Sequence, residues 1–139
     1  MDMCQEGESE LWVDPATGLM WARQDNRSDL SWKQAISYSQ NLRLAGYSDW
    51  RLPTIEELES LYDPTVDVPG IMTDGSVARM HVKGGLQLSG WQWSSTVDVA
   101  PGWTPAPEWA WTLIFLSGDR RSMRFSARLL GRALCVRNC

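Results

Sequence analysis

The first apolar residues of the chain form two short runs on either side of a turn. Leu11–Val13 and Leu19–Trp21 flank Asp14–Gly18, in which the aspartate opens a turn, the proline fixes φ and the glycine permits a left-handed exit. Apolar runs joined in this way are typical of paired strands. The pattern predicts a β-hairpin at the start of the domain.

Two helices are predicted next, each beginning at a capping box, in which the N-cap residue and the third helical residue bond each other's backbone. The first box is Ser31–Gln34, and apolar residues then recur on one helical face, which predicts a helix over about 32–44. The second box, Thr54–Glu57, directly follows a proline, and Pro64 is expected to end that helix.

The remaining chain alternates between turn residues and short apolar segments. Residues 63–90 predict a long irregular segment with one short strand near 77–82. Residues 109–116 are apolar on both faces, as in a covered central strand, and residues 121–125 alternate as in a half-exposed strand. A last strand is predicted over 133–137.

These elements predict an α+β fold in one domain, residues 11–139, after an N-terminal tail of residues 1–10. A chain of 139 residues is long enough for one core and short for two. If the last strand pairs beside Leu11–Val13, the two ends of the chain meet in one sheet. No apolar run approaches the roughly 20 residues of a membrane-spanning helix, so no membrane insertion is expected.

The three cysteines, Cys4, Cys135 and Cys139, lie at the extremities of the chain. In an oxidising compartment a disulfide joining the ends is expected, with Cys4 and Cys139 as the preferred pair and Cys4 with Cys135 left open. Residues 1–10 carry no basic start and no apolar run, so they contain no secretory signal. The alternative is a reduced, cytoplasmic protein with three inert thiols.

Charge is distributed unevenly along the chain. The net charge is −4, but residues 119–139 hold six arginines and one acid, a local balance of +5 that leaves −9 for residues 1–118. An acidic protein is a poor general binder of nucleic acid, although a basic stretch can attract a particular anion. The simpler interpretation is that these arginines are solvated or paired with the acidic second helix.

No set of residues in the chain forms a catalytic or metal-binding pattern. The single histidine, His81, has no adjacent nucleophile and no orienting acid, and neither paired metal-ligand cysteines nor an Asp-x-Asp-x-Asp-Gly loop is present. The acids of the second helix, Glu56, Glu57 and Glu59, lie at its positive end, where carboxylates are common. We therefore expect no enzyme, no cofactor and no metal. The alternative, calcium held by loop acids, would use Asp67, Asp74 or Asp98.

Four segments together resemble one family. They are Asp14–Trp21, Ala45–Thr54 with Glu57 and Leu58, Trp93–Ser95, and Cys135–Arg137. In this order they resemble the Lcl C-terminal domain family, a bacterial domain named after a collagen-like adhesin, over nearly the whole chain. The resemblance implies a C-type-lectin-like fold, with two helices on small antiparallel sheets, paired termini and a ligand surface built from long loops. It also implies an extracellular or cell-envelope location, and the adhesin itself binds sulfated polysaccharides and trimerises, so a homotrimer is an expected option.

The central motif is expected to serve the scaffold. Trp50, Pro53 and Trp93 are interpreted as structural, because a buried indole fills a large volume and proline holds the preceding residue extended. Arg51 is expected to be structural too, with Asp49 or a backbone carbonyl as its partner, since a half-buried guanidinium needs several acceptors.

Two related protein classes offer alternatives. The segment from Arg51 to Glu57 also resembles formylglycine-generating enzymes, but the active-site cysteine pair of those enzymes has no counterpart here. Variable proteins of diversity-generating retroelements display changeable residues on a similar scaffold.

The sequence therefore predicts a non-catalytic ligand-binding or adhesion module that recognises a glycan or a protein. The expected ligand residues are exposed aromatics and arginines, since indoles stack on sugar rings and guanidinium groups bind carboxylate or sulfate. These residues are Trp91, Trp103, Trp109, Arg120, Arg121, Arg124 and Arg128. The alternative is a purely structural or oligomerisation module.

Overall fold

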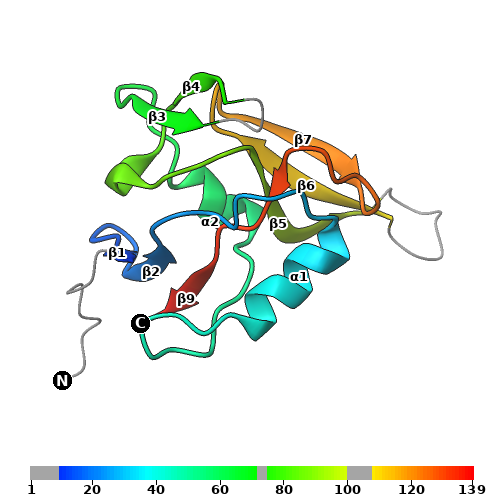
Figure 1. The fold of residues 1–139 in the computed structure, drawn as a ribbon, viewed down its shortest axis with the longest axis horizontal. Coiled ribbons are helices and arrows are strands. Elements are labelled where there is room, and N and C mark those ends of the chain that lie inside the picture. Colours follow the sequence, from blue (N-terminus) through cyan, green and yellow to red (C-terminus); the bar gives the residue numbers. More distant parts are fainter. Residues whose placement is uncertain (1–9, 72–74, 100–107) are drawn as a thin grey trace.

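The computed structural model describes residues 10–71, 75–99 and 108–139, and it shows a mixed α+β fold with three small sheets (Figure 1). In chain order the elements are β1 (Leu11–Val13), β2 (Leu19–Ala22), α1 (Trp32–Asn41), α2 (Ile55–Glu59), β3 (Val68–Ile71), β4 (Val77–Met80), the 3-10 turn η1 (Lys83–Gly85), β5 (Trp91–Asp98), β6 (Trp109–Ile114), β7 (Asp119–Arg124), β8 (Gly131–Arg132) and β9 (Val136–Asn138). The sheets have the orders β1-β2-β9, β3-β4 and β7-β6-β5-β8.

The predicted N-terminal hairpin is confirmed, with Leu11 opposite Ala22 in the β1–β2 pair. The last strand, β9, pairs with β2 and not with β1, so the expected neighbour was wrong. The physical reason is burial: Met20 and Trp21 of β2 are both fully buried, which suits a strand with a neighbour on each side. The hairpin and the C-terminal strand nevertheless share one sheet.

Both capping boxes are confirmed. Ser31 caps α1 and Thr54 caps α2, each with the reciprocal side-chain bond of the box. Helix α1 ends at Asn41, three residues earlier than predicted, because Leu42 is already extended. Helix α2 is one short turn, and beyond it the chain turns to bond with residues 81–83, where the N–H of Lys83 donates to the carbonyl of Leu61 at 2.9 Å.

The region between 63 and 90 is more regular than predicted. The strand near 77–82 is present as β4, but it has an antiparallel partner, β3, that the sequence did not indicate. Pro69 and Gly70 lie within β3, and these residue types argue against a strand unless it lies in a small sheet or at an edge. A side chain at Gly70 would come 2.6 Å from the carbonyl oxygen of Leu88, so close packing explains the glycine.

The four-stranded sheet confirms the covered strand at 109–116 as β6, which lies between β7 and β5. Strand β5 was not among the predicted elements, and it carries the hydroxyls of Ser94, Ser95 and Thr96. Those hydroxyls do bond backbone groups: Ser94 Oγ donates to the carbonyl of Trp111 at 2.7 Å, and Thr96 Oγ1 accepts from the N–H of Ile55 at 3.0 Å. Strand β5 is thus joined to β6 and α2 by side-chain hydrogen bonds, in addition to its backbone hydrogen bonds within the sheet.

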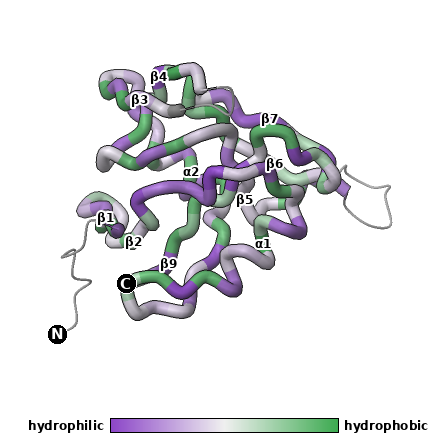
Figure 2. Tube along the Cα trace, viewed as in Figure 1, coloured by the Kyte–Doolittle hydropathy of each residue, from purple (hydrophilic) through white to green (hydrophobic). Residues whose placement is uncertain are grey.

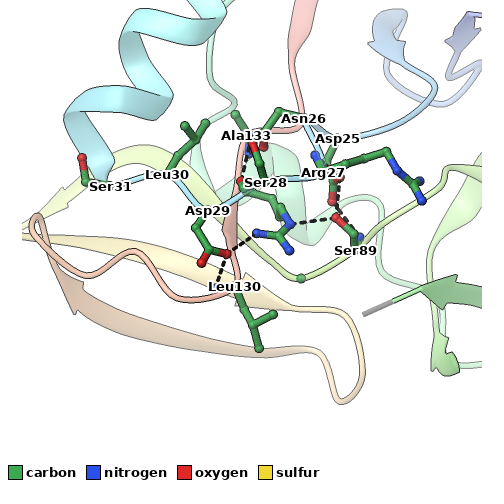
Figure 3. Close-up of polar contacts among 12 residues, drawn as sticks. Asp25, Asn26, Arg27, Ser28, Asp29, Leu30, Ser31, Ser89, Leu130 and Ala133 are labelled. Carbon is green, nitrogen blue, oxygen red and sulfur yellow. Dashed lines mark hydrogen bonds and ion pairs between the residues drawn. The ribbon is translucent and has the colours of Figure 1, made fainter. Parts of the chain in front are cut away.

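The core consists of three apolar clusters around Trp21, Trp50 and Trp93. Buried apolar residues come from both helices and from each of the three sheets, and Figure 2 shows how hydrophobic and hydrophilic segments alternate along the chain. A buried polar network adds to them (Figure 3): Arg132 is fully buried and bonds Asp29 Oδ1 and Ser89 Oγ, each at 2.7 Å, and Ser89 in turn bonds Asp25. This network ties three separate segments together beneath β8.

The cysteines at the end of the chain differ in state. Cys139 is disulfide-bonded, whereas Cys135 is a free thiol buried beside Trp50, and burial raises its pKa to about 12. Cys4 lies outside the described residues. Within the described part of the chain, no helix is long and apolar enough to cross a membrane.

Candidate functional site

One face of the β6–β7 hairpin gathers aromatic and cationic side chains. We call this the Trp–Arg surface and define it as Trp109, Trp111, Arg120 and Arg124. The register places Trp109 opposite Arg124, Trp111 opposite Ser122 and Leu113 opposite Arg120. Directly opposed residues share one face of a sheet, so strand alternation alone brings these side chains together.

The outer end of this surface carries an exposed cation–π pair. The guanidinium of Arg124 lies 4.7 Å from the ring centroid of Trp109, and 39% of the area of Trp109 is exposed. Such pairs are worth about 0.5–1 kcal/mol at exposed sites. The contact therefore orients the guanidinium, while the indole keeps part of its surface open to solvent.

The inner end of the Trp–Arg surface is occupied by a salt bridge. Arg120 lies 5.3 Å from the Trp111 ring and donates two hydrogen bonds to Glu59 of α2, at 3.0 and 2.8 Å. The bonds to Glu59 raise the pKa of Arg120. The prediction that the arginines pair with the acidic helix is thus correct for Arg120, and its guanidinium is less available to a ligand than that of Arg124.

A shallow depression of about 440 Å³ adjoins Arg124 at the start of α1. Its lining residues are Ser31, Lys33, Glu108, Arg124, Phe125 and Ser126. Phe125 is held in place by a stacked contact with Trp32, whose ring centroid is 4.1 Å away. The depression thus has a rigid aromatic residue, two hydroxyls, two cations and one acid around it.

The other expected ligand residues lie elsewhere. Trp91 packs edge-to-face on the buried Trp93 at 5.0 Å, so it belongs to the core. Arg121 lies opposite Thr112, on the other face of the hairpin from Trp109. Arg128 follows β7, where its charge lowers the pKa of Asp29. Trp103 lies outside the described residues. The structure therefore brings together three of the seven, Trp109, Arg120 and Arg124.

The acids named for calcium do not form a site in the described residues. Asp98 accepts from Ser122 at 2.7 Å, Asp67 pairs with His81 at 3.0 Å, and Asp74 lies outside the described residues. Across residues 10–71, 75–99 and 108–139, no group of three or more His, Cys, Asp or Glu side chains could hold a metal ion.

The family model for the Lcl C-terminal domain matches residues 10–137 of the 139. The chain belongs to the Lcl C-terminal domain family. This confirms the resemblance, and it indicates a surface-associated module of the adhesin type. No match was found among curated proteins.

In this Lcl C-terminal domain the central motif is structural. Arg51 forms a two-pronged contact with Glu57, at 2.8 and 2.9 Å, and also donates to Asn138 Oδ1 at 2.6 Å. The expected partner Asp49 was wrong: it binds Arg137 at 2.6 Å instead. The expected backbone carbonyl is present, but as a longer contact to Leu52 at 3.4 Å. Because Glu57 also accepts from the N–H of Thr54, one carboxylate joins the helix cap to the last strand.

The remaining structural residues of the Lcl C-terminal domain are buried as expected. Trp50 lies in the cluster with Cys135, and Trp93 donates its indole N–H to the carbonyl of Leu30 at 2.8 Å. The carbonyl of Pro53 accepts from the N–H of Ser95 at 2.7 Å. The motif therefore connects the start of α2 to β5 through Pro53 and to β9 through Arg51.

Lys33 and Glu108, which adjoin the Trp–Arg surface, were not predicted from the sequence. Lys33 follows the N-cap Ser31, and a lone lysine at an exposed helical position carries no signal of its own. The contact between the start of α1 and the end of β7 depends on the Trp32–Phe125 stack, which spans most of the chain and cannot be inferred from local patterns.

A second cavity, of about 300 Å³, lies away from the hairpin. It is formed where small residues, Ala22, Ala133 and Cys135, face the longer Tyr38 of α1 and Leu42, which directly follows that helix. Burial raises the pKa of Tyr38. The cavity was not predicted, since the residues that shape it are small and distant in sequence.

Proposed function

We propose that this Lcl C-terminal domain is a non-catalytic ligand-binding module of a bacterial surface protein, and that it recognises an acidic glycan or an acidic protein segment. The observation that carries the proposal is the exposed Arg124–Trp109 pair, 4.7 Å apart, beside the depression that contains Lys33. The pair offers an apolar ring and a cation fixed next to it.

The chemistry of the pair suits such a ligand. An exposed indole face stacks on a sugar ring or on an apolar side chain. A guanidinium binds carboxylate or sulfate with two parallel hydrogen bonds, and Lys33 adds a second positive charge nearby. Because Arg124 is already oriented by Trp109, less side-chain entropy is lost when a ligand binds.

The proposal requires no catalytic group. The hydroxyl of Ser94 donates to a backbone carbonyl, and the single histidine, His81, is paired with Asp67 where β4 ends and β3 begins, away from the β6–β7 hairpin. We therefore assign the module to binding rather than to a reaction related to formylglycine-generating enzymes.

We further propose a C-type-lectin-like scaffold and an extracellular or envelope location. The pairing of β9 with the N-terminal hairpin, the two capped helices and the long connections support the scaffold. The disulfide at Cys139 supports an oxidising compartment. An experimental structure compared with known lectin-like folds would test the first, and cell fractionation the second.

Retention on a heparin column at low salt tests the ligand proposal. We expect the wild-type chain to be retained at low salt and to be released as the salt concentration rises. Arg124→Ala and Trp109→Ala should be released at a lower salt concentration than the wild type. The matched control is Arg79→Ala, an exposed arginine on β4 with one long contact to Asp67 at 3.6 Å. If both hairpin variants and the control elute with the wild type, the Trp–Arg surface is not the binding site.

A further inference from the structure

The outer edge of β7 is open along the strand. In the four-stranded sheet β7 is the terminal strand, and its only strand partner in the described residues is β6 (Figure 1). An edge strand presents unpaired N–H and C=O groups that another extended segment can bind. Such edges are normally short, covered or protected by charge, so the side chains around this one matter.

Two bonds identify which backbone groups of β7 point outward. The N–H of Phe125 donates to the carbonyl of Glu108 at 2.8 Å, and the carbonyl of Arg121 accepts from Thr112 Oγ1 at 2.9 Å. Backbone groups alternate in direction along an antiparallel strand, so the odd-numbered residues face β6 and Arg120, Ser122 and Arg124 face outward.

Among the described residues, most of these outward groups have no partner. The carbonyl of Arg124 accepts from the N–H of Ala127 at 3.0 Å. Within the described residues no hydrogen bond uses the outward N–H and C=O of Arg120 and Ser122. An added strand would therefore find a complete repeat of the ladder at Arg120 and Ser122, where both the donors and the acceptors are open.

A second copy of the chain is a poor occupant of this edge. A symmetric antiparallel pair that overlaps five residues of β7 can be centred on Arg121 or on Ser122. The first register places Arg121 opposite its own copy, and the second places Arg120 opposite Arg124 of the other copy. Like charges directly opposite one another destabilise a pair of strands. The arginines thus protect the edge from self-association.

The same charges favour an acidic occupant. Arg124 and Arg121 are exposed on opposite faces of the hairpin, and neither forms an ion pair within the described residues. An extended segment lying along β7 would therefore meet one cation on each face. We propose that β7 pairs along its outer edge with an acidic, extended segment of another protein.

This inference narrows the proposed function to a protein ligand, but it rests on backbone groups of β7 and not on the indole of Trp109. The two can fail separately. A substitution that closes the backbone edge leaves Trp109 and Arg124 in place, so it should not alter retention on heparin.

Binding of labelled peptides to the full chain, followed by fluorescence anisotropy at low salt, tests the edge. The probes are two end-blocked octapeptides, one alternating Glu and Val and the other alternating Lys and Val. Ser122→Pro removes an outward N–H without removing a bond to β6, and proline is tolerated on edge strands. Ser122→Ala is its control, because both variants lose the bond from Ser122 Oγ to Asp98.

We expect the acidic peptide to bind and the basic peptide not to bind. Ser122→Pro should weaken binding of the acidic peptide by about tenfold or more relative to Ser122→Ala. This corresponds to the loss of one hydrogen bond between peptide and strand and the distortion of the adjacent one. Equal binding of both peptides, no binding of either, or unchanged affinity in a folded Ser122→Pro variant would overturn the proposal.

A second variant tests the binding of an acidic segment at the β7 edge if Ser122→Pro does not fold. Arg121→Glu changes only an exposed side chain, so it should keep the circular dichroism spectrum of the wild type. It should weaken binding of the acidic peptide and strengthen binding of the basic one. Unaltered peptide preference in Arg121→Glu would contradict the proposed charge complementarity.

Discussion

Arg132 and Arg124 belong to the same arginine-rich stretch, yet their surroundings are opposite. Arg132 is fully buried and bonds Asp29 and Ser89, whereas Arg124 is exposed and lies over Trp109. The first is held by acceptors from two other segments, and the second by one aromatic ring. The local charge balance of +5 in residues 119–139 is therefore not one surface feature, because part of it lies in the core.

The largest difference between the two arginines should appear in stability. Arg132→Met leaves Asp29 without its guanidinium partner, although the N–H of Leu130 still bonds the carboxylate, and removal of one member of a buried pair costs about 3–5 kcal/mol. Since the Asp29 side chain is 34% exposed, we expect the lower end of that range, about 3 kcal/mol, in urea denaturation. Arg79→Met is the control, with a change of less than about 0.5 kcal/mol. Equal midpoints for the two variants would show that Arg132 does not hold the core.

Acid should reveal the same contrast. Hydrogen bonds from Arg132, Arg137 and Arg51 lower the pKa values of Asp29, Asp49 and Glu57, whose ordinary values are 3.8, 3.8 and 4.5. A carboxylate with a lowered pKa contributes stability that is present above its ordinary pKa and is lost as the pH falls through the value in the folded protein. Urea midpoints should therefore fall below about pH 4.5.

The matched variant for the acid effect is Arg132→Met. Its loss of stability in acid should be less steep than that of the wild type, because the pKa of Asp29 is no longer held down by Arg132. Arg124→Met should keep the wild-type slope. An identical slope in all three chains would contradict the assignment.

A smaller effect is expected for Arg120, which is intermediate between the two cases. Arg120→Ala removes the two bonds to Glu59 and the contact with Trp111, and exposed pairs of this kind are worth about 0.5 kcal/mol. The loss should shrink in high salt, because salt screens exposed charges. A salt-independent loss would instead point to packing of the arginine stem on Trp111.

The smallest effect on stability should come from Arg124→Ala. Its exposed contact with Trp109 contributes about 0.5 kcal/mol, the lower end of the range for exposed cation–π pairs, so thermal melting should hardly change. The same substitution should reduce heparin retention under the proposed function. A variant that loses stability without losing retention would reverse our comparison and make Arg124 the structural arginine.

Local signals predicted the helices well and the strands unevenly. The capping boxes at Ser31 and Thr54 set both helix starts, because each box is complete within four residues. Strand β5 was missed because its polar side chains bond backbone groups of α2 and β6, which no local pattern contains. Strand β3 was missed because its proline and glycine normally argue against a strand.

The candidate site was predicted in part for a similar reason. Trp109 and Arg124 could be named from residue type and exposure, but their contact follows from the register of the β6–β7 pair. Trp91 and Arg128 have the same residue types but lie elsewhere. Trp91 packs on Trp93 and Arg128 lies near Asp29, and these contacts depend on the tertiary fold, not on the local sequence. The partner predicted for Arg51, Asp49, was wrong because Glu57 approaches Arg51 only once α2 is formed.

The position of β9 has a consequence for biosynthesis. Strand β2, with Met20 and Trp21, leaves the ribosome well before its second neighbour, Val136–Asn138. Until those residues leave the exit tunnel, one side of β2 has no hydrogen-bonding partner. Closure of this sheet is therefore among the last steps of folding during synthesis, and the nascent hairpin must wait, partly uncovered, for almost the whole domain to be translated.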